Sequence, residues 1–229
     1  MQAPEAAPSQ RVLRLVLCAL ALTVAAGLFG AIADGVVHGD GLTRFDAEVA
    51  RFVYRNTPAE LRAAMRVVSD VHSTVAIGAY SAAVVVFLAI RGQWQRVAAV
   101  LLCVYGGLGV NVLMKLAFQR ARPAFDDALL TLPTYSFPSG HVAATTLFYG
   151  LIVTWVFAAT ERPRWRGLAV AGWLLAVALV ASSRMVLGVH YLSDVVAAFA
   201  EGVIWLAVCL GGLAAFRREA PASHSPDSS

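Results

Sequence analysis

Residues 97–118 read VAAVLLCVYGGLGVNVLMKLAF, an apolar stretch interrupted by a single charged side chain, Lys115. A helix needs roughly 20 mostly apolar residues to cross the hydrocarbon core of a bilayer, and this stretch is long enough. Five further stretches have the same character: 12–33, 74–90, 142–160, 167–184 and 191–215. The chain of 229 residues is 59% hydrophobic and 14% charged, with a mean hydropathy of +0.70, which is unusual for a soluble domain. The sequence therefore predicts an all-α, polytopic membrane helical bundle with six transmembrane helices.

The six stretches form one predicted domain, 11–218, between two short tails. Residues 1–10 and 219–229 are enriched in Pro and Ser, which predicts disordered ends. The first stretch follows two arginines, as a signal peptide would, but it is long and no clear small-residue cleavage site follows it. We therefore interpret it as a retained first span.

The long connection at 34–73 carries helical signals of its own. An amphipathic helix in the membrane interface is predicted by four apolar residues that recur at helical spacing among charged residues such as Asp46: Phe45, Val49, Phe52 and Val53. Thr57 followed by Pro58 predicts the start of a second helix, with Thr57 as the cap and Pro58 in the first helical position. These short interfacial helices either only link two spans or help to shape the route by which a lipid reaches the protein.

Three polar segments occur at the ends of the predicted spans. They read KLAFQRARP (115–123), PSGH (138–141) and SRMVLGVHYLSD (183–194). Because successive spans alternate in direction, the end of the third span, the start of the fourth, the end of the fifth and the start of the sixth all reach one membrane face. The sequence thus predicts that six chemically active side chains meet there: Lys115, Arg122, His141, Arg184, His190 and Asp194.

The cations and the helix start in these segments suit an anion that carries several oxygens. Lys115, Arg122 and Arg184 supply fixed positive charge, and the planar fork of arginine can hold two phosphate oxygens at once. Ser139 and Gly140 begin the fourth span, so their amides and the positive end of that helix are expected to point at the anion. Phosphoryl transfer asks mainly for such positioning and charge stabilisation.

The two histidines suit nucleophilic catalysis on phosphorus. A neutral imidazole can attack if its other ring nitrogen holds a proton against an acceptor, and Asp194 lies one helical turn after His190. His141 remains as the acid that protonates the departing oxygen and later as the base that activates water. Since the two rings need opposite protonation states, we expect a bell-shaped pH profile.

The three segments resemble the motifs of the type 2 phosphatidic acid phosphatase superfamily, K-x6-R-P, P-S-G-H and S-R-x5-H-x3-D, with every motif position filled. The resemblance implies the integral membrane lipid phosphatase branch, with His190 as the nucleophile that forms a phosphohistidine and His141 as the acid and base. It implies a lipid phosphate or diphosphate as substrate, of the undecaprenyl diphosphate, phosphatidylglycerol phosphate or phosphatidic acid type. The bilayer is then the environment of a protein of phospholipid metabolism.

No cluster of Asp, Glu, His or Cys has the spacing of a metal site, so the sequence predicts neither a metal ion nor another cofactor. Cys18, Cys103 and Cys209 all lie in apolar stretches and indicate no disulfide framework. Glu201 is the one acid well inside a span. An intramembrane acid is a candidate for function, and the alternative is a hydrogen bond to a neighbouring helix.

The arginines of two short turns predict the orientation in the membrane. Six spans put both termini on one side, and the turns 91–96 and 161–166 on that side carry five arginines: Arg91, Arg96, Arg162, Arg164 and Arg166. Basic residues are equally frequent on the two sides, but short loops weigh most in the positive-inside rule. The termini are therefore expected in the cytoplasm, with the active site of an inner-membrane protein facing the periplasm or exterior.

Other function classes remain open on the sequence alone. The same histidine could pass phosphate to a lipid or sugar acceptor, as a phosphotransferase, or the chain could be a lipid transporter or scaffold that retains a phosphate pocket. Soluble vanadium haloperoxidases share the motif residues, but the hydropathy argues against that branch. The net charge of +4 indicates no nucleic-acid partner, because the basic residues are scattered among turns. The oligomeric state is not predicted.

Overall fold

The computed structural model describes residues 8–39, 41–125 and 133–219, and within these ranges the regular structure is helical, without a β-strand. This confirms the all-α class. The elements are α1 (Pro8–His38), α2 (Gly41–Asn56), α3 (Ala59–Val71), α4 (Thr74–Ile90), α5 (Trp94–Val100), the π-helical segment η1 (Leu101–Gly106), α6 (Gly107–Phe118), α7 (Gly140–Ala159), α8 (Pro163–Val186) and α9 (Leu192–Glu219). The predicted tails 1–10 and 219–229 lie outside the described residues except where α1 and α9 include 8–10 and 219.

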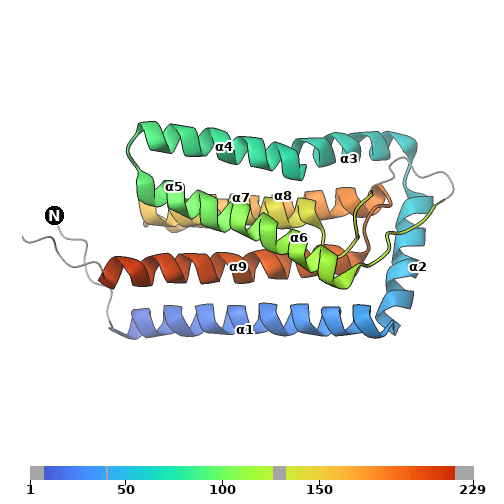
Figure 1. The fold of residues 1–229 in the computed structure, drawn as a ribbon, viewed down its shortest axis with the longest axis horizontal. Coiled ribbons are helices and arrows are strands. Elements are labelled where there is room, and N and C mark those ends of the chain that lie inside the picture. Colours follow the sequence, from blue (N-terminus) through green and yellow to red (C-terminus); the bar gives the residue numbers. More distant parts are fainter. Residues whose placement is uncertain (1–7, 40, 126–132, 220–229) are drawn as a thin grey trace, which may run out of the picture.

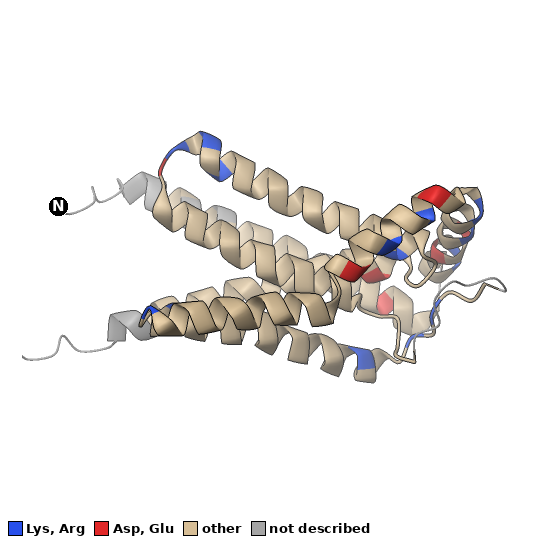
Figure 2. Ribbon diagram, turned by 90° about the horizontal axis from the view of Figure 1, so that it is seen from above, with Lys and Arg blue, Asp and Glu red and all other residues tan. Residues whose placement is uncertain are grey.

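Six segments of the described chain are long and apolar enough to cross a membrane, the number that the sequence predicted: Cys18–His38, Ala59–Ile90, Trp94–Phe118, Gly140–Ala159, Pro163–Val186 and Leu192–Ala215. The second begins at Ala59, where the sequence predicted a start at residue 74, because it includes α3, which was expected in the interface. Helices α5, η1 and α6 follow one another without a break and make up the third of these. Figure 1 shows the long helices side by side, with the start of α1 and the end of α9 at the same end of the bundle. In Figure 2 the charged residues gather at the two ends, and the shafts between them are almost free of charge.

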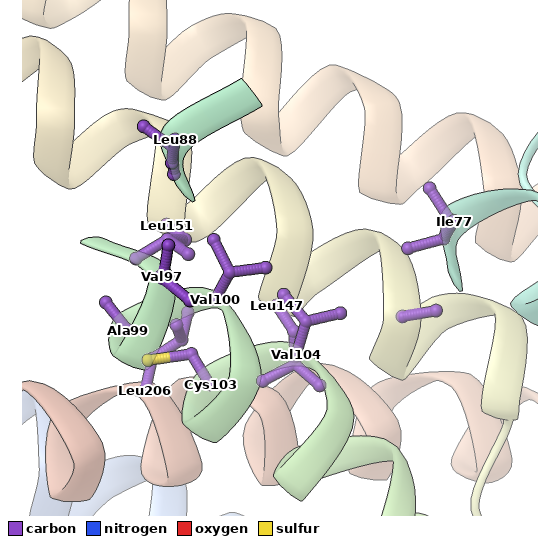
Figure 3. Packing of buried hydrophobic residues seen from close by; sticks show 11 residues of the cluster. Ile77, Leu88, Val97, Ala99, Val100, Cys103, Val104, Leu147, Leu151 and Leu206 are labelled. Carbon is purple, nitrogen blue, oxygen red and sulfur yellow. The ribbon is translucent and has the colours of Figure 1, made fainter. Parts of the chain in front are cut away.

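The core of the bundle is the packing of the third span against α7 and α9. Val100, Cys103 and Val104 pack with Leu147 of α7 and Leu206 of α9 (Figure 3). Between membrane helices such packing depends on close van der Waals contact, because lipid tails are as apolar as the side chains.

A glycine permits this close approach. A Cβ atom on Gly107 would come within 2.5 Å of Leu147 Cδ1 and 2.8 Å of Trp205 Cδ1. Both distances are too short for a real contact, so a larger residue would force the Leu147 and Trp205 side chains to shift where α6 meets α7 and α9. This packing holds the end of α6, and with it Lys115, beside the start of α7.

The two helices of the first long connection differ from each other in placement. Helix α2 crosses the end of the bundle, as expected for an interfacial helix, whereas α3 runs along the bundle in line with α4 (Figure 1) and packs against α8. Its predicted cap is wrong: α3 begins at Ala59, and the Thr57 hydroxyl donates backwards to the Val53 carbonyl at 2.6 Å. A hydroxyl that finds an acceptor one turn earlier is not available to cap the next helix.

Candidate active site

The end of α8 turns the chain so that His190 faces the centre of the bundle end. Gly188 adopts φ +68°, and its amide donates to the Met185 carbonyl at 3.0 Å while the Val189 amide donates to the Arg184 carbonyl at 3.2 Å. This is the left-handed glycine stop typical of helix C-termini. A Cβ atom at Gly188 would lie 2.8 Å from the ring of Tyr54 and 2.9 Å from that of Phe125. Both the backbone conformation and the space at this position therefore require glycine.

The contacts of His190 determine which ring nitrogen carries the proton. Nδ1 lies 3.3 Å from Asp194 Oδ2, and Nε2 lies 3.1 Å from Arg122 Nη1. A guanidinium only donates and a carboxylate only accepts, so Nδ1 bears the hydrogen and Nε2 carries the lone pair. Burial lowers the pKa of His190 to about 3, although Asp194 acts in the opposite direction. The ring is thus neutral near pH 7, with the lone pair of Nε2 directed at the Arg122 guanidinium.

The carboxylate of Asp194 is fully buried and accepts from several donors at once. Its Oδ2 accepts from the Tyr191 amide at 2.9 Å and from the Ser136 hydroxyl, besides facing His190. Its Oδ1 accepts from Arg120 Nη1 at 2.7 Å. With both oxygens engaged, the carboxylate has a single orientation, and this orientation presents an acceptor to His190.

Lys115 and Arg122 hold the segment that precedes α7. Lys115 Nζ donates to the carbonyls of Tyr135 at 2.9 Å and Pro138 at 2.6 Å. Arg122 donates to the carbonyls of Thr134 at 2.7 Å and Val189 at 2.7 Å, among others. The two predicted phosphate ligands are therefore bonded to backbone oxygens in this structure, so they must exchange these partners in order to grip an anion.

Arg184 and Ser139 each have a buried polar atom without a partner among the described residues, unlike Lys115 and Arg122. Arg184 donates through Nη1 to Ser69 of α3, but within the described residues its Nε, like the Oγ of Ser139, makes no hydrogen bond. An orphaned buried donor is costly, and an oxyanion next to His190 would satisfy both groups.

The amides at the start of α7 only partly match the expectation. The Ser139 amide does not face the site, because it donates to the Asp194 carbonyl at 3.1 Å. Gly140 is the first residue of α7, and the first amides of a helix have no partner within the helix. The prediction for the Ser139 amide is therefore wrong, and the amide of Gly140 and the hydroxyl of Ser139 are the groups that stay available for an anion.

His141 follows Gly140 and lies at the same end of the bundle. It is within electrostatic range of Arg184, His190, Arg122 and Lys115. The motif residues from four spans are thus brought together, as the alternation of helices predicted. Among the described residues there is no group of three or more His, Cys, Asp or Glu side chains that could hold a metal ion.

Four further residues of the site were missed by the sequence analysis: Asp46, Arg120, Ser136 and Ser193. Arg120 lies inside the first motif segment and Ser193 directly precedes Asp194, so their position was the only available signal. Asp46 was grouped with the charged residues of an amphipathic helix, yet it is fully buried. In the structure Asp46, Ala50 and Tyr54 form the buried face of α2, and no pattern in the sequence distinguished Asp46 from an acid that faces water.

Glu201 lies deeper in the bundle, 7% exposed. Its Oε2 accepts from Asn111 Nδ2 of α6 at 2.9 Å, which is the hydrogen bond to a neighbouring helix that the sequence offered as the alternative to catalysis. Asn111 is one turn before Lys115, and a Cβ on Gly140 would lie 3.3 Å from its Oδ1. The hydrogen-bonded pair of Asn111 and Glu201 thus lies beneath Lys115 and Gly140 and supports their positions from inside the bundle.

A profile of the PAP2 superfamily matches residues 96–218, more than half of the chain. The chain belongs to the PAP2 superfamily. This PAP2 match contains all three motif segments and confirms the resemblance seen in the sequence. Together with the six apolar segments of the described chain, it identifies a multi-pass integral membrane protein.

Two solved structures are similar to this PAP2 protein. The crystal structure of the first transmembrane PAP2 type phosphatidylglycerolphosphate phosphatase from Bacillus subtilis has 21% sequence identity and a TM-score of 0.68, and the match covers 89% of this chain and 98% of that one. The crystal structure of Aquifex aeolicus LpxE has 21% identity and a TM-score of 0.56, with 73% and 95% covered. At this identity the likeness establishes the fold alone. No curated protein sequence matches the chain significantly.

Proposed function

We propose that this protein is an integral membrane lipid phosphatase that hydrolyses a lipid phosphate or diphosphate through a phosphohistidine on His190, without a metal ion. The observation that carries the proposal is the environment of that ring. Its Nε2 lone pair faces Arg122, its Nδ1 proton is held by Asp194, and Arg184 and Ser139 next to it have buried donors without partners.

The reaction would proceed in two balanced steps. First, Nε2 of His190 attacks phosphorus and forms the N–P bond, while the bond from phosphorus to the lipid oxygen breaks and His141 donates its proton to the departing alkoxide or phosphate. Second, His141 takes a proton from water, the water oxygen attacks phosphorus, and the N–P bond breaks to release inorganic phosphate and regenerate the neutral imidazole.

The charges of the site support the absence of a metal requirement. Lys115, Arg122 and Arg184 would place three positive charges around one phosphoryl group, which is the neutralisation that metal ions supply in other phosphotransfer enzymes. Lys115 and Arg122 would release the backbone carbonyls of the 134–138 segment as the phosphate oxygens take their place.

The position of the site at the end of a membrane bundle favours a lipid substrate. A phosphate at headgroup depth can enter the site while its tail remains in the bilayer. Undecaprenyl diphosphate, phosphatidylglycerol phosphate and phosphatidic acid all fit this description, and one fold relative is described as a phosphatidylglycerolphosphate phosphatase.

The orientation follows from the short loops and belongs to the same proposal. Helices α4 and α5 are joined by 91–93, and α7 and α8 by 160–162, on the side where the arginine-rich turns predict cytoplasm. The catalytic end would then face the periplasm or exterior. A reporter fused to the C-terminus tests this: fluorescence of a green fluorescent protein fusion is expected, and activity of an alkaline phosphatase fusion would contradict it.

Phosphate release by the purified protein tests the activity. The protein in detergent is given a panel of lipid phosphates in the presence of a chelator, next to His190→Ala, Lys115→Ala and a control, His38→Ala. His38 is exposed at the end of α1, and its contacts within the described residues are to Asp34 of the same helix. Wild type and the control are expected to release phosphate, and the two site variants are not.

Inhibition supplies a second readout. Vanadate adopts the five-coordinate geometry of phosphorus in transfer and should inhibit at the same site. Activity that is lost in the chelator and restored by a divalent cation would overturn the metal-free mechanism. Lipid movement across liposomes without phosphate release would favour the transporter alternative.

A further inference from the structure

Asp46 is a buried carboxylate that comes from outside the three motif segments. It lies on α2, the helix that crosses the end of the bundle (Figure 1), and it is fully buried. Its Oδ1 accepts from the Ser193 amide at 3.0 Å, and its Oδ2 accepts from Arg120 Nη2 at 2.8 Å and from the Ser193 hydroxyl. Its partners are therefore Arg120 and the residue directly before Asp194.

Arg120 joins this carboxylate to that of Asp194. Its Nη2 donates to Asp46, and its Nη1 donates to Asp194 Oδ1 at 2.7 Å and to Ser193 Oγ at 2.7 Å. The guanidinium also lies over the ring of Tyr191, 4.3 Å from its centroid. One planar fork thus spans two carboxylates from two helices, an arrangement that lysine could not reproduce.

The turn that ends α6 aims Arg120 at these carboxylates. Gln119 adopts a left-handed conformation with φ 45°, and its amide donates to the Lys115 carbonyl at 3.0 Å. The Arg120 carbonyl then accepts from the Ser136 amide at 2.8 Å. The backbone on both sides of Arg120 is therefore held by the segments that carry Lys115 and the α7 start.

The charges around Arg120 indicate what Asp46 contributes, because the guanidinium is shared between the Asp46 and Asp194 carboxylates. Burial opposes the charge of Arg120, but Asp194 and Asp46 together raise the pKa of the guanidinium above its ordinary value. If Asp46 were neutral, Arg120 would be attracted to Asp194 alone and would draw that carboxylate away from His190. Asp46 thus limits how strongly Arg120, which holds Oδ1 of Asp194, pulls that carboxylate away from His190, which faces Oδ2.

We propose that Asp46 and Arg120 are positioning residues that set the orientation of Asp194, and so the tautomer of His190, from the interfacial helix α2. Among the hydrogen bonds of the described residues, those of the Asp46 and Arg120 side chains go to each other, Ser193 and Asp194, and not to the groups assigned to the phosphate, which are Lys115, Arg122, Arg184, Ser139 and the Gly140 amide. The inference rests on the proposed function in its catalytic part, but the tautomer can be measured without turnover.

Four variants test it, with phosphate release and thermal stability measured for each: Asp46→Asn, Arg120→Gln, the double variant, and the control Asp34→Asn. Asp34 is an exposed carboxylate near the end of α1, paired with His38. Asp46→Asn and Arg120→Gln are each expected to lower kcat by about 10- to 100-fold, the size of effect that follows loss of the partners that orient metal-ligating side chains, with KM little changed. Because both act through Asp194, the double variant should lose no more than the stronger single variant.

The tautomer of His190 is the second readout. In ¹⁵N-histidine spectra the wild type and Asp34→Asn should show His190 protonated on Nδ1, whereas Asp46→Asn should show a population protonated on Nε2. Should Asp46→Asn fail to fold, Arg120→Lys retains the charge and is expected to give the same shift. Unchanged tautomer and kcat in a folded Asp46→Asn or Arg120→Lys protein would overturn the inference. A wild type without phosphatase activity, but with the predicted tautomer change, would overturn the proposed function and leave this inference standing.

Discussion

Replacement of Asp194 by asparagine should reverse the tautomer of His190. The amide has nearly the shape of the carboxylate but has only one accepting oxygen. Arg120 is a charged donor at 2.7 Å and is expected to keep that oxygen. The amide nitrogen would then face Nδ1 of His190 and donate to it, so the proton moves to Nε2 and the attacking lone pair is lost.

The size of the effect follows from the number of contacts involved. Asp194 Oδ2 now serves His190, Ser136 and the Tyr191 amide, and an NH₂ group in its place would satisfy none of these donors. Loss of the correct tautomer in a buried acid–histidine pair lowers kcat by about 10⁴-fold in a serine protease. We expect a decrease of about 10³- to 10⁴-fold, equal to about 4 to 5.5 kcal/mol in the barrier.

The assay is single-turnover phosphate release by folded Asp194→Asn protein, with Asp34→Asn as the control for an exposed carboxylate on the same end of the bundle. The melting temperature of each variant in detergent checks that the bundle is intact. If Asp194→Asn retained more than about a tenth of wild-type kcat, the tautomer argument would be refuted.

The remaining predictions concern stability, pH dependence and the role of Glu201. Gly188→Ala should destabilise the protein by about 1 to 2 kcal/mol through its left-handed backbone alone and by more through contact with Tyr54 and Phe125; an unchanged melting temperature would contradict the turn geometry. Because the pKa of His190 is lowered to about 3, the unfolded chain binds an extra proton below about pH 6.5, so this group should cost up to about 1.4 kcal/mol per pH unit as the pH falls towards 3. A denaturation series should show this slope weakened in His190→Asn, and equal slopes would refute the low pKa. Because the pKa of His190 is lowered to about 3, protonation of this ring should reduce activity only well below neutral pH. An acid limb of the bell-shaped profile closer to neutral pH would then come from titration of the substrate phosphate. Glu201→Gln should keep kcat within a few-fold, since its role is the bond to Asn111; loss of turnover in a folded variant would assign it to catalysis.

The spans and the motif positions could be predicted from the sequence because each depends on local information. An apolar stretch such as 97–118 is a span wherever it occurs, and the alternation of spans alone brings Lys115, His141 and His190 to one end. The π-helical segment η1 within the third span was not predictable in this way, because its apolar residues would fit an ordinary helix equally well.

The surroundings of Asp194 could not be predicted because their partners are remote in sequence. Asp46 and Ser193 are 147 positions apart, and a charged residue on an amphipathic helix has the same pattern whether it faces water or a buried arginine. Likewise, Thr57 has the sequence of a helix cap, but the carbonyl of Val53 competes for its hydroxyl. Such choices depend on the folded neighbours and carry no periodic signal.

Identification of the phosphorylated residue tests the central claim most directly. Wild-type protein in a chelator is mixed with ³²P-labelled lipid phosphate, quenched within one turnover in alkali, which preserves phosphohistidine, and digested for peptide mapping. The account predicts label on the peptide that contains His190, more of it in His141→Ala because the water step is slowed, and none in His190→Ala. Label on any other residue, or phosphate release without a labelled intermediate on that time scale, would contradict it.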